Sequence, residues 1–280
     1  MRINIIDTGY FKLDGGAMFG VVPKTLWSKH NPADEKNLCS WAMRCLLIED
    51  GGKLILIDTG MGDKQDAKFF GHYDLHGDET LLSSIREKGY DPKDITDVIL
   101  THLHFDHVGG AVQFSKDGSK LSPTFANATY WSNDAHWQWA IEPNPREKAS
   151  FLKENILPLQ ESGQLHFIEK GTSPFSSIDF INVDGHTEQM MLPVIRYQDK
   201  KIIYAADLFP SSFHVPIPWI MSYDMRPLIT MEEKIQVLQM AVNEDCILLF
   251  EHDPLYEAAL VEQTDKGIRI KHRGGLSEFI

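Results

Sequence analysis

The stretch Thr101-His102-Leu103-His104-Phe105-Asp106-His107 places three imidazoles and one carboxylate within six residues. It directly follows the strand-like run 97–100 and is closely followed by Gly109-Gly110. A tight turn that leaves a strand can aim such closely spaced side chains at one point. Borderline-soft divalent metals, zinc above all, prefer imidazole nitrogen mixed with carboxylate oxygen. The stretch therefore predicts a metal site.

The pattern H-x-H-x-D-H resembles the signature of the metallo-β-lactamase-fold hydrolases. Further segments are similar to motifs of that family in the same order and at similar spacing. They are the strand-then-Asp segment 55–60, the turn Gly185-His186-Thr187, the strand end Ala205-Ala206-Asp207 and the segment 250–253. The resemblance covers most of the chain. It does not fix the substrate, because this fold carries many chemistries on one metal centre.

The resemblance implies an α/β (α+β) fold, an αββα four-layer sandwich of two mixed β-sheets flanked by helices. The chain has 280 residues, 42% hydrophobic and 24% charged, which is enough for one large core or two small domains. No linker rich in Pro, Gly or Ser divides it, and the expected ligands run from His102 to His252. We therefore expect a single domain over residues 1–280.

Local patterns predict the elements that carry these motifs. We expect a helix capped by Asp78 and a helix opened by the capping box Thr230-Met231-Glu232-Glu233. A hairpin should join 42–49 to 53–57 across Asp50-Gly51-Gly52. Helices are also expected at 132–140 and 151–159, and strands at 2–6, 97–100, 165–168, 178–183, 190–197, 201–205, 246–250 and 268–273.

The resemblance also implies a ligand set for two zinc ions per chain. One ion would be bound by His102, His104 and His186, the second by Asp106, His107 and His252, and Asp207 would bridge both. Two divalent ions, two carboxylates and a shared hydroxide leave a net charge of about +1, which would stabilise an anionic transition state. Asp106 and Asp207 are thus also expected to be catalytic. The family position of Asp58 suggests a carboxylate that orients the metal loop. Manganese, cobalt or iron could replace zinc.

One position departs from the pattern of the family's homoserine-lactone hydrolases. Many of them carry a tyrosine three residues after the bridging aspartate, where this chain has Pro210. His214 and Tyr223 lie downstream in the same region, and either could supply the missing hydrogen-bond donor. Aromatic residues crowd the expected loops and could wall a pocket for an acyl or aryl group.

The favoured interpretation is an N-acyl homoserine lactonase, a quorum-quenching enzyme that opens a lactone ring with metal-bound hydroxide. The alternatives are an aryl-ester or phosphotriester hydrolase, a glyoxalase II-like thioester hydrolase and a non-catalytic ligand sensor. The expected partner is a small lactone or ester. A substrate panel separates the enzymes, and a metal count together with hydrolysis of a generic lactone separates enzyme from sensor.

Charge and hydropathy exclude other classes. The formal charge is −13, with 27 basic and 40 acidic residues, which disfavours nucleic acid as a partner. No run of about 18 apolar residues predicts a membrane span, and no apolar stretch near Met1 predicts a signal peptide. We expect a cytoplasmic chain without a disulfide framework, because its three cysteines form no C-x-x-C pair. The resemblance also allows a homodimer.

Overall fold

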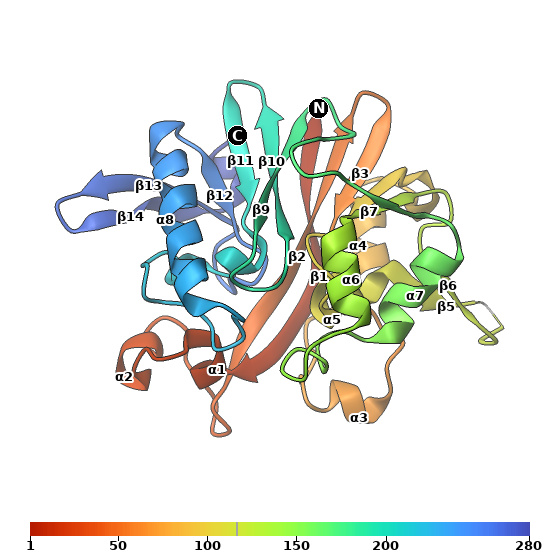
Figure 1. Ribbon diagram of the computed structural model, residues 1–280, viewed down its shortest axis with the longest axis horizontal. Coiled ribbons are helices and arrows are strands. Elements are labelled where there is room, and N and C mark those ends of the chain that lie inside the picture. Colours follow the sequence, from red (N-terminus) through yellow and green to blue (C-terminus); the bar gives the residue numbers. More distant parts are fainter. Residues whose placement is uncertain (116) are drawn as a thin grey trace. The chain divides into compact units, whose positions relative to one another are not determined.

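The computed structural model describes residues 1–115 and 117–280, which divide into two compact units. The first unit comprises Met1–Gly9 and Met43–Pro174, and the second comprises Tyr10–Ala42 and Phe175–Ile280. Two six-stranded mixed sheets, both accompanied by helices, confirm the predicted mixed α/β class (Figure 1). The expectation of a single domain over residues 1–280 stays a prediction.

The first sheet has the strand order β1-β2-β3-β4-β7-β8. Its strands are β1 (Arg2–Asp14), β2 (Leu38–Asp50), β3 (Lys53–Ile57), β4 (Asp97–Ile99), β7 (Thr129–Ser132) and β8 (Leu165–Phe167). β2 and β3 pair antiparallel with Asp50 opposite Lys53, which confirms the predicted hairpin. β3, β4, β7 and β8 run parallel, so their carboxyl ends meet at one edge of the sheet. The end of β1 and the start of β2 belong to the second unit.

Helices cover this sheet through one apolar cluster. Leu81 and Ile85, Trp137 and Ala140, and Ile156 and Leu159 come from three helices and are buried together with strand residues. Those helices are α4 (Leu81–Glu87), α6 (Asp134–Ile141) and α7 (Lys153–Glu161); shorter elements of the unit are α3 (Ala67–Phe70), α5 (Phe105–Val108), η1 (Pro92–Asp94), η2 (Gly109–Ala111), β5 (Val112–Phe114) and β6 (Leu121–Pro123).

The cap predicted for α4 was wrong. Thr80, not Asp78, caps the helix, since its side chain accepts a hydrogen bond from the backbone N–H of Ser83. The Ser83 side chain accepts in turn from the backbone N–H of Thr80, so the two hydroxyls form a reciprocal capping box. This box starts the helix two residues later than expected.

The second sheet has the order β14-β13-β12-β11-β10-β9. Its strands are β9 (Ile178–Val183), β10 (Met190–Tyr197), β11 (Lys200–Tyr204), β12 (Ile247–Leu249), β13 (Ala258–Thr264) and β14 (Gly267–Gly274). β10 is antiparallel to both β9 and β11, while β11 and β12 are parallel. β9, β11 and β12 therefore point the same way, and their carboxyl ends lie at the same edge.

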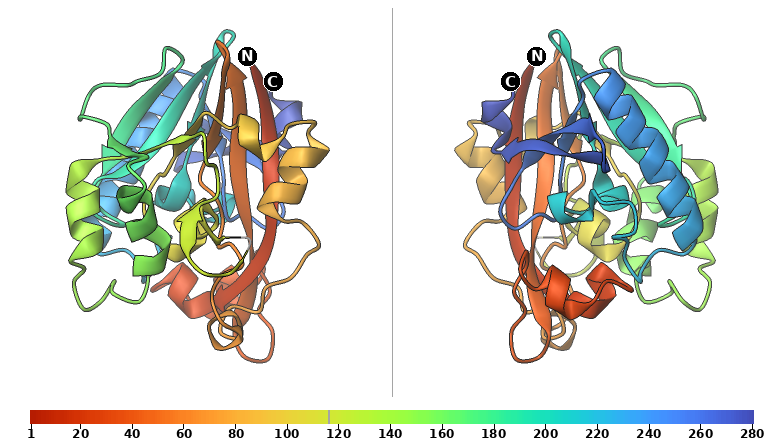
Figure 2. Two further views of the ribbon diagram at one scale, coloured as in Figure 1. Left: turned by 90° about the vertical axis from the view of Figure 1, so that its right-hand side faces the viewer. Right: turned by 90° about the vertical axis from the view of Figure 1, so that its left-hand side faces the viewer.

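The long helix α8 (Pro227–Asn243) packs against β13 and β14, and Figure 2 shows it from two sides. The helix begins three residues before the predicted capping box, because Pro227 occupies its first turn, where a missing N–H costs nothing. Glu233 instead accepts hydrogen bonds from the backbone N–H groups of Asp184 and Gly185. Shorter elements of this unit are α1 (Gly15–Phe19), α2 (Lys24–Trp27), η3 (Ala206–Leu208), η4 (Ser212–His214) and η5 (Leu276–Glu278).

Cys39, Cys45 and Cys246 are all buried free thiols, which agrees with a chain that needs no disulfide framework. Among the helices formed by residues 1–115 and 117–280, none combines the length and apolar character that a bilayer crossing requires.

Candidate metal centre

In the first unit, the metal motif leaves the carboxyl end of β4, next to the end of β3, where Asp58 lies. Asp58 is fully buried and adopts a left-handed backbone conformation with φ of 56°. Its Oδ1 accepts the backbone N–H of Thr101 at 2.8 Å, and its Oδ2 accepts the Thr101 hydroxyl at 2.6 Å. The same Oδ2 lies 3.0 Å from Nδ1 of His107. One carboxylate thus holds both ends of the motif and leaves Nε2 of His107 to face a ligand.

The two leading histidines of the motif converge. Nε2 of His102 lies 3.1 Å from Nδ1 of His104, and both side chains are buried. Neighbouring ligands of a tetrahedral zinc ion, each bonded at about 2.05 Å, are separated by about 3.3 Å. The spacing therefore fits two ligands of one ion. His102 would bind the ion through Nε2, and His104 would bind it through Nδ1.

The outer nitrogen of His104 faces a second buried carboxylate. Nε2 of His104 lies 3.4 Å from Oε1 of Glu147, which is 2% exposed. Oε2 of Glu147 accepts the indole N–H of Trp139 at 2.7 Å and the side-chain amide of Asn144 at 2.6 Å. Asp106 completes this part of the unit, with Oδ2 3.9 Å from Nε2 of His107.

The Gly-Gly pair after the motif is required by close packing. A Cβ on Gly109 would lie 1.9 Å from the carbonyl oxygen of Met61, and one on Gly110 would lie 2.2 Å from that of Thr59. The ammonium of Lys64 donates a hydrogen bond to the Gly109 carbonyl. The segment after Asp58 therefore lies directly on the segment after the metal motif.

In the second unit, Asp207 lies between two histidines. Its Oδ2 is 3.1 Å from Nε2 of His186, and its Oδ1 is 3.2 Å from Nε2 of His252. All three residues are buried, and they follow β9, β11 and β12, whose carboxyl ends share an edge. Both separations again match the spacing of about 3.3 Å between ligands of a tetrahedral ion. One carboxylate oxygen towards each imidazole is the arrangement that a bridging ligand requires.

The outer nitrogens of these two histidines also have acceptors. Nδ1 of His186 lies 2.9 Å from Oδ1 of Asp224, and Nδ1 of His252 lies 2.7 Å from the carbonyl oxygen of Ala42. Burial lowers the pKa of His186, but the carboxylates of Asp207 and Asp224 outweigh it and raise that pKa to about 10 in the metal-free protein. The histidine would exchange its proton for a metal.

The two expected donors lie in different surroundings. His214 is buried, with Nδ1 2.7 Å from the Ser211 hydroxyl and Nε2 2.8 Å from the carbonyl oxygen of Met18. Its ring stacks on Phe19 with centroids 5.0 Å apart. Both nitrogens of His214 are therefore engaged within the unit. Tyr223 is 37% exposed and sits beside the buried Asp224.

Aromatic residues that the sequence analysis did not single out surround the motif of the first unit. Phe105, which stands between His104 and Asp106, contacts the rings of Tyr73 and Phe69 at centroid distances of 4.7 and 5.4 Å. Burial, followed by the nearby Asp106 carboxylate, raises the pKa of the Tyr73 phenol to about 12, so its hydroxyl stays protonated at neutral pH.

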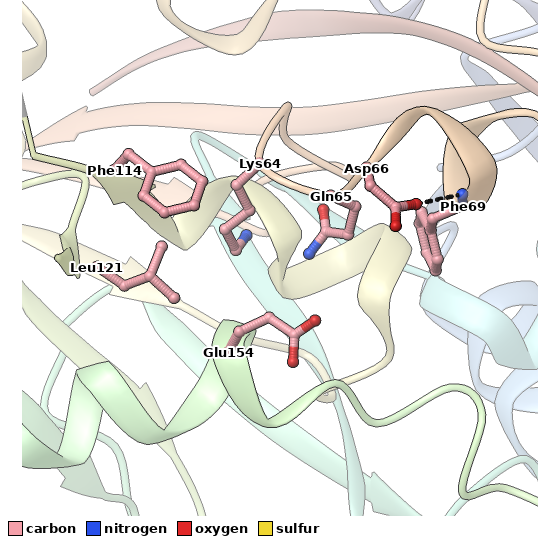
Figure 3. A pocket seen from close by; sticks show the side chains of 7 residues that line it. All are labelled: Lys64, Gln65, Asp66, Phe69, Phe114, Leu121 and Glu154. Atoms are coloured by element: carbon pink, nitrogen blue, oxygen red, sulfur yellow. Dashed lines mark hydrogen bonds between the residues drawn. The ribbon is translucent and has the colours of Figure 1, made fainter. Parts of the chain in front are cut away.

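Phe69 also lines an open pocket of about 360 Å³. Its remaining lining side chains are Lys64, Gln65, Asp66, Phe114, Leu121 and Glu154. Figure 3 shows the apolar side chains of Phe114 and Leu121 beside Lys64, with Glu154 of α7 opposite. Burial lowers the pKa of Lys64 to about 8, although the Asp63 and Glu154 carboxylates act in the other direction.

A buried cation holds the loop that follows Asp207. Lys234, on α8, is 0% exposed. Its ammonium donates to the carbonyl oxygens of Pro216, Ile217 and Trp219 at 2.9, 3.2 and 2.8 Å, and lies 5.5 Å from the ring centroid of Phe209. Three acceptors satisfy a charge that would otherwise be costly to bury.

Comparisons with known proteins agree with this chemistry. The family model described as the metallo-beta-lactamase superfamily matches residues 44–252. A probable metallo-hydrolase of Mycobacterium tuberculosis is 25% identical, over 87% of both chains. The crystal structure of a probable metal-dependent hydrolase from Staphylococcus aureus is similar with a TM-score of 0.88 and 30% identity, covering 98% of this chain and 96% of that one. AidC, a dizinc quorum-quenching lactonase in complex with a product, has a TM-score of 0.77 at 22% identity, covering 96% and 92%.

Proposed function

The chain belongs to the metallo-β-lactamase superfamily and is a hydrolase, and from this premise we propose that it opens the lactone ring of N-acyl homoserine lactones. The ligand sets of the two units would hold two zinc ions. The proposed ligands are His102, His104 and His186 for one ion, Asp106, His107 and His252 for the other, and Asp207 as the bridge. The separations of 3.1, 3.1 and 3.2 Å between neighbouring ligand atoms support this assignment.

The protein's own part in the reaction is to fix and shield these groups. When bound, two divalent ions supply the Lewis acidity that activates water and polarises the lactone carbonyl. Asp58 orients His107 by accepting its Nδ1–H, so the lone pair of Nε2 stays directed at the site. Asp207 holds its two oxygens towards His186 and His252. Because these ligands are buried, little reorganisation is needed when charge develops on the opening ring.

The aromatic cluster formed by Phe69, Tyr73 and Phe105 in the first unit supports an acyl lactone as the substrate. Phe105 lies within the metal motif, and its contacts with Phe69 and Tyr73 place apolar surface next to the proposed ligands His104 and Asp106. Phe69 continues into the pocket lined by Phe114 and Leu121. An acyl chain that enters this surface gains about 0.8 kcal/mol for each fully buried CH₂ group.

Because Pro210 has no hydrogen-bond donor in its side chain, another side chain would have to donate to the opening ring. We propose His214, Tyr223 or Tyr73 for this role, the last because its protonated phenol lies beside Phe105. A donor that acts on the reacting oxygen should lower kcat by roughly 10–10³-fold when removed. His214→Ala, Tyr223→Phe and Tyr73→Phe, compared at equal metal content, would identify it. His214 would have to give up one of its two present partners to act.

A substrate panel tests the proposed function. Zinc-loaded protein should hydrolyse N-acyl homoserine lactones with a kcat/KM at least roughly tenfold above that for phosphotriesters and aryl esters, a transition-state difference of about 1.4 kcal/mol. Longer acyl chains should lower KM. If kcat/KM is higher for phosphotriesters, aryl esters or S-lactoylglutathione, the substrate assignment is wrong, but the proposed metal chemistry is unaffected. Zinc-loaded protein that hydrolyses none of them would instead support a ligand sensor.

A further inference from the structure

We infer that Asp224 is a positioning residue for the metal centre: its carboxylate fixes the tautomer and the ring orientation of His186. This role rests on the proposed function, because it assumes that His186 binds a metal through Nε2. Oδ1 of Asp224 lies 2.9 Å from Nδ1 of His186, while Nε2 on the other side of the ring faces Asp207 at 3.1 Å. The ring is thus held between two carboxylates, one at each nitrogen.

Backbone hydrogen bonds set the position of Asp224. The N–H of Met225 donates to the carbonyl of His186 at 3.1 Å, and the N–H of Arg226 donates to that of Gly185 at 2.8 Å. The segment that carries Asp224 is therefore paired with the segment that carries His186. The guanidinium of Arg226 adds a third link, because it donates to the carbonyl of Asp184 at 2.6 Å.

Close packing of α8 fixes the other side of this turn. A Cβ on Gly185 would lie 2.3 Å from Oγ1 and 2.5 Å from the backbone nitrogen of Thr230. Only glycine lets the first turns of α8 lie over the turn before His186. Glu233, one helical turn further along α8, accepts the backbone N–H groups of Asp184 and Gly185 at 2.6 and 3.0 Å. The start of α8 therefore holds the backbone around His186, and Asp224 holds its side chain.

The chemistry at Nδ1 explains why a carboxylate is useful there. Asp224 is 4% exposed, and a buried carboxylate is costly unless it is paired. Accepting the Nδ1–H provides that partner and places the imidazole's lone pair on Nε2. The negative charge also makes the imidazole a stronger base, and so a stronger metal ligand. Loss of such an outer partner typically weakens metal binding 10–100-fold.

Zinc affinity of the full chain, measured by competition with a chromogenic chelator, tests this role without reference to substrate. Asp224→Asn keeps the shape and one acceptor oxygen but removes the charge, and we expect roughly tenfold weaker binding of the ion that His186 would bind. Asp224→Ala also removes the acceptor and should weaken binding further, towards 100-fold. In zinc-loaded wild type, proton NMR should show a slowly exchanging imidazole N–H of His186 that shifts in Asp224→Asn and disappears in Asp224→Ala.

Glu233→Gln is the matched control. It disturbs the backbone of the same turn through the contacts of Glu233 with Asp184 and Gly185, so it should lower Tm while zinc affinity stays within about twofold. Equal zinc affinity in Asp224→Asn and wild type would overturn the role of Asp224 and leave the proposed function intact. Equal losses in Asp224→Asn and Glu233→Gln would reduce Asp224 to a structural residue. Wild type that binds no zinc would contradict the metal centre itself.

Discussion

The two units supply their proposed ligands in opposite ways. In the first unit, His102, His104, Asp106 and His107 come from one short segment after β4, which includes the start of α5. In the second, His186, Asp207 and His252 follow three different strands and meet because β9, β11 and β12 point the same way. A short motif can therefore encode half of a metal site by itself. The other half depends on the topology of the sheet.

The hydrogen-bond acceptors that hold the proposed ligands also differ between the two units. In the first unit, Glu147 faces His104, and Asp58 holds both Thr101 and His107, so one carboxylate supports several residues of the motif at once. In the second unit each histidine has its own acceptor, Asp224 for His186 and the Ala42 carbonyl for His252. We therefore expect that removing Asp58 disturbs several residues of the first set at once, whereas removing one acceptor in the second unit disturbs one histidine.

The largest effect is expected at Asp207, the shared residue of the second set. Asp207→Ala should lower kcat/KM for the proposed lactone hydrolysis by roughly 10³-fold or more, because the proposed bridge between two ions would be lost. Elemental analysis should find about two metals per chain in wild type and fewer in the variant, while circular dichroism stays unchanged. One ion or none in fully loaded wild type would contradict the two-metal model.

Asp58→Ala should produce the next largest effect, and mainly on stability. It removes the carboxylate that accepts from two donors of Thr101 and from one of His107, which should lower the free energy of unfolding by about 3 kcal/mol. Asp66→Ala is the control, because it removes the exposed N-cap of α3 and should cost only about 1 kcal/mol. Urea denaturation that gives equal losses for both would disprove the dependence of the motif on Asp58.

A methyl group at Gly109 should come third. Its Cβ would meet the Met61 carbonyl at 1.9 Å, so the two segments must separate, at a cost of about 1–3 kcal/mol. Gly275 of the second unit is a matched control, since its nearest neighbour to a Cβ is the Glu257 carboxylate at 3.6 Å. Thermal unfolding should give a clearly lower Tm for Gly109→Ala than for Gly275→Ala. Similar Tm values would argue that the motif of the first unit tolerates displacement.

His214 provides the most specific effect, a change in the pH dependence of stability. Burial, only partly opposed by the hydrogen bond to Met18, lowers the pKa of His214 from 6.5 to about 3. The unfolded chain therefore takes up a proton between those pH values while the native protein does not. Stability that is present above pH 6.5 is lost as the pH falls, by up to about 1.4 kcal/mol per pH unit.

His214→Gln should flatten this slope, whereas His166→Gln, at an exposed histidine of the first unit, should keep it. The measurement is urea denaturation of the metal-free variants between pH 7 and about pH 4. Parallel curves for wild type and His214→Gln would show that other groups cause the acid sensitivity.

The sequence predicts the ligands of the two units unequally, because one set comes from a single segment and the other from three separate strands. The metal motif and the hairpin of β2 and β3 were visible because their partners are close in sequence or part of one recognisable pattern. Asp58, His186, Asp207 and His252 were predicted only through the family resemblance. Each is a single polar residue after a buried strand, and spacing alone says nothing about which strands are neighbours.

Other contacts had no sequence signal. Asp224 and Glu147 reach histidines that are 38 and 43 positions away, and neither belongs to a motif. The starts of α4 and α8 were misplaced because two capping patterns competed locally. Thr80 with Ser83 replaced Asp78, and Pro227 started α8 before the Thr230–Glu233 box could cap it.

The burial of Lys234 makes this residue a natural reporter of unfolding. Its amine is 0% exposed and is already bound to three carbonyl oxygens, so an acylating reagent cannot reach it while the loop 216–219 stays in place. Surface amines would be labelled within the first minutes. The mass tag on the peptide that contains Lys234 would then accumulate only as fast as this part of the second unit opens. The labelling rate of Lys234 would therefore report the rate of local opening around it.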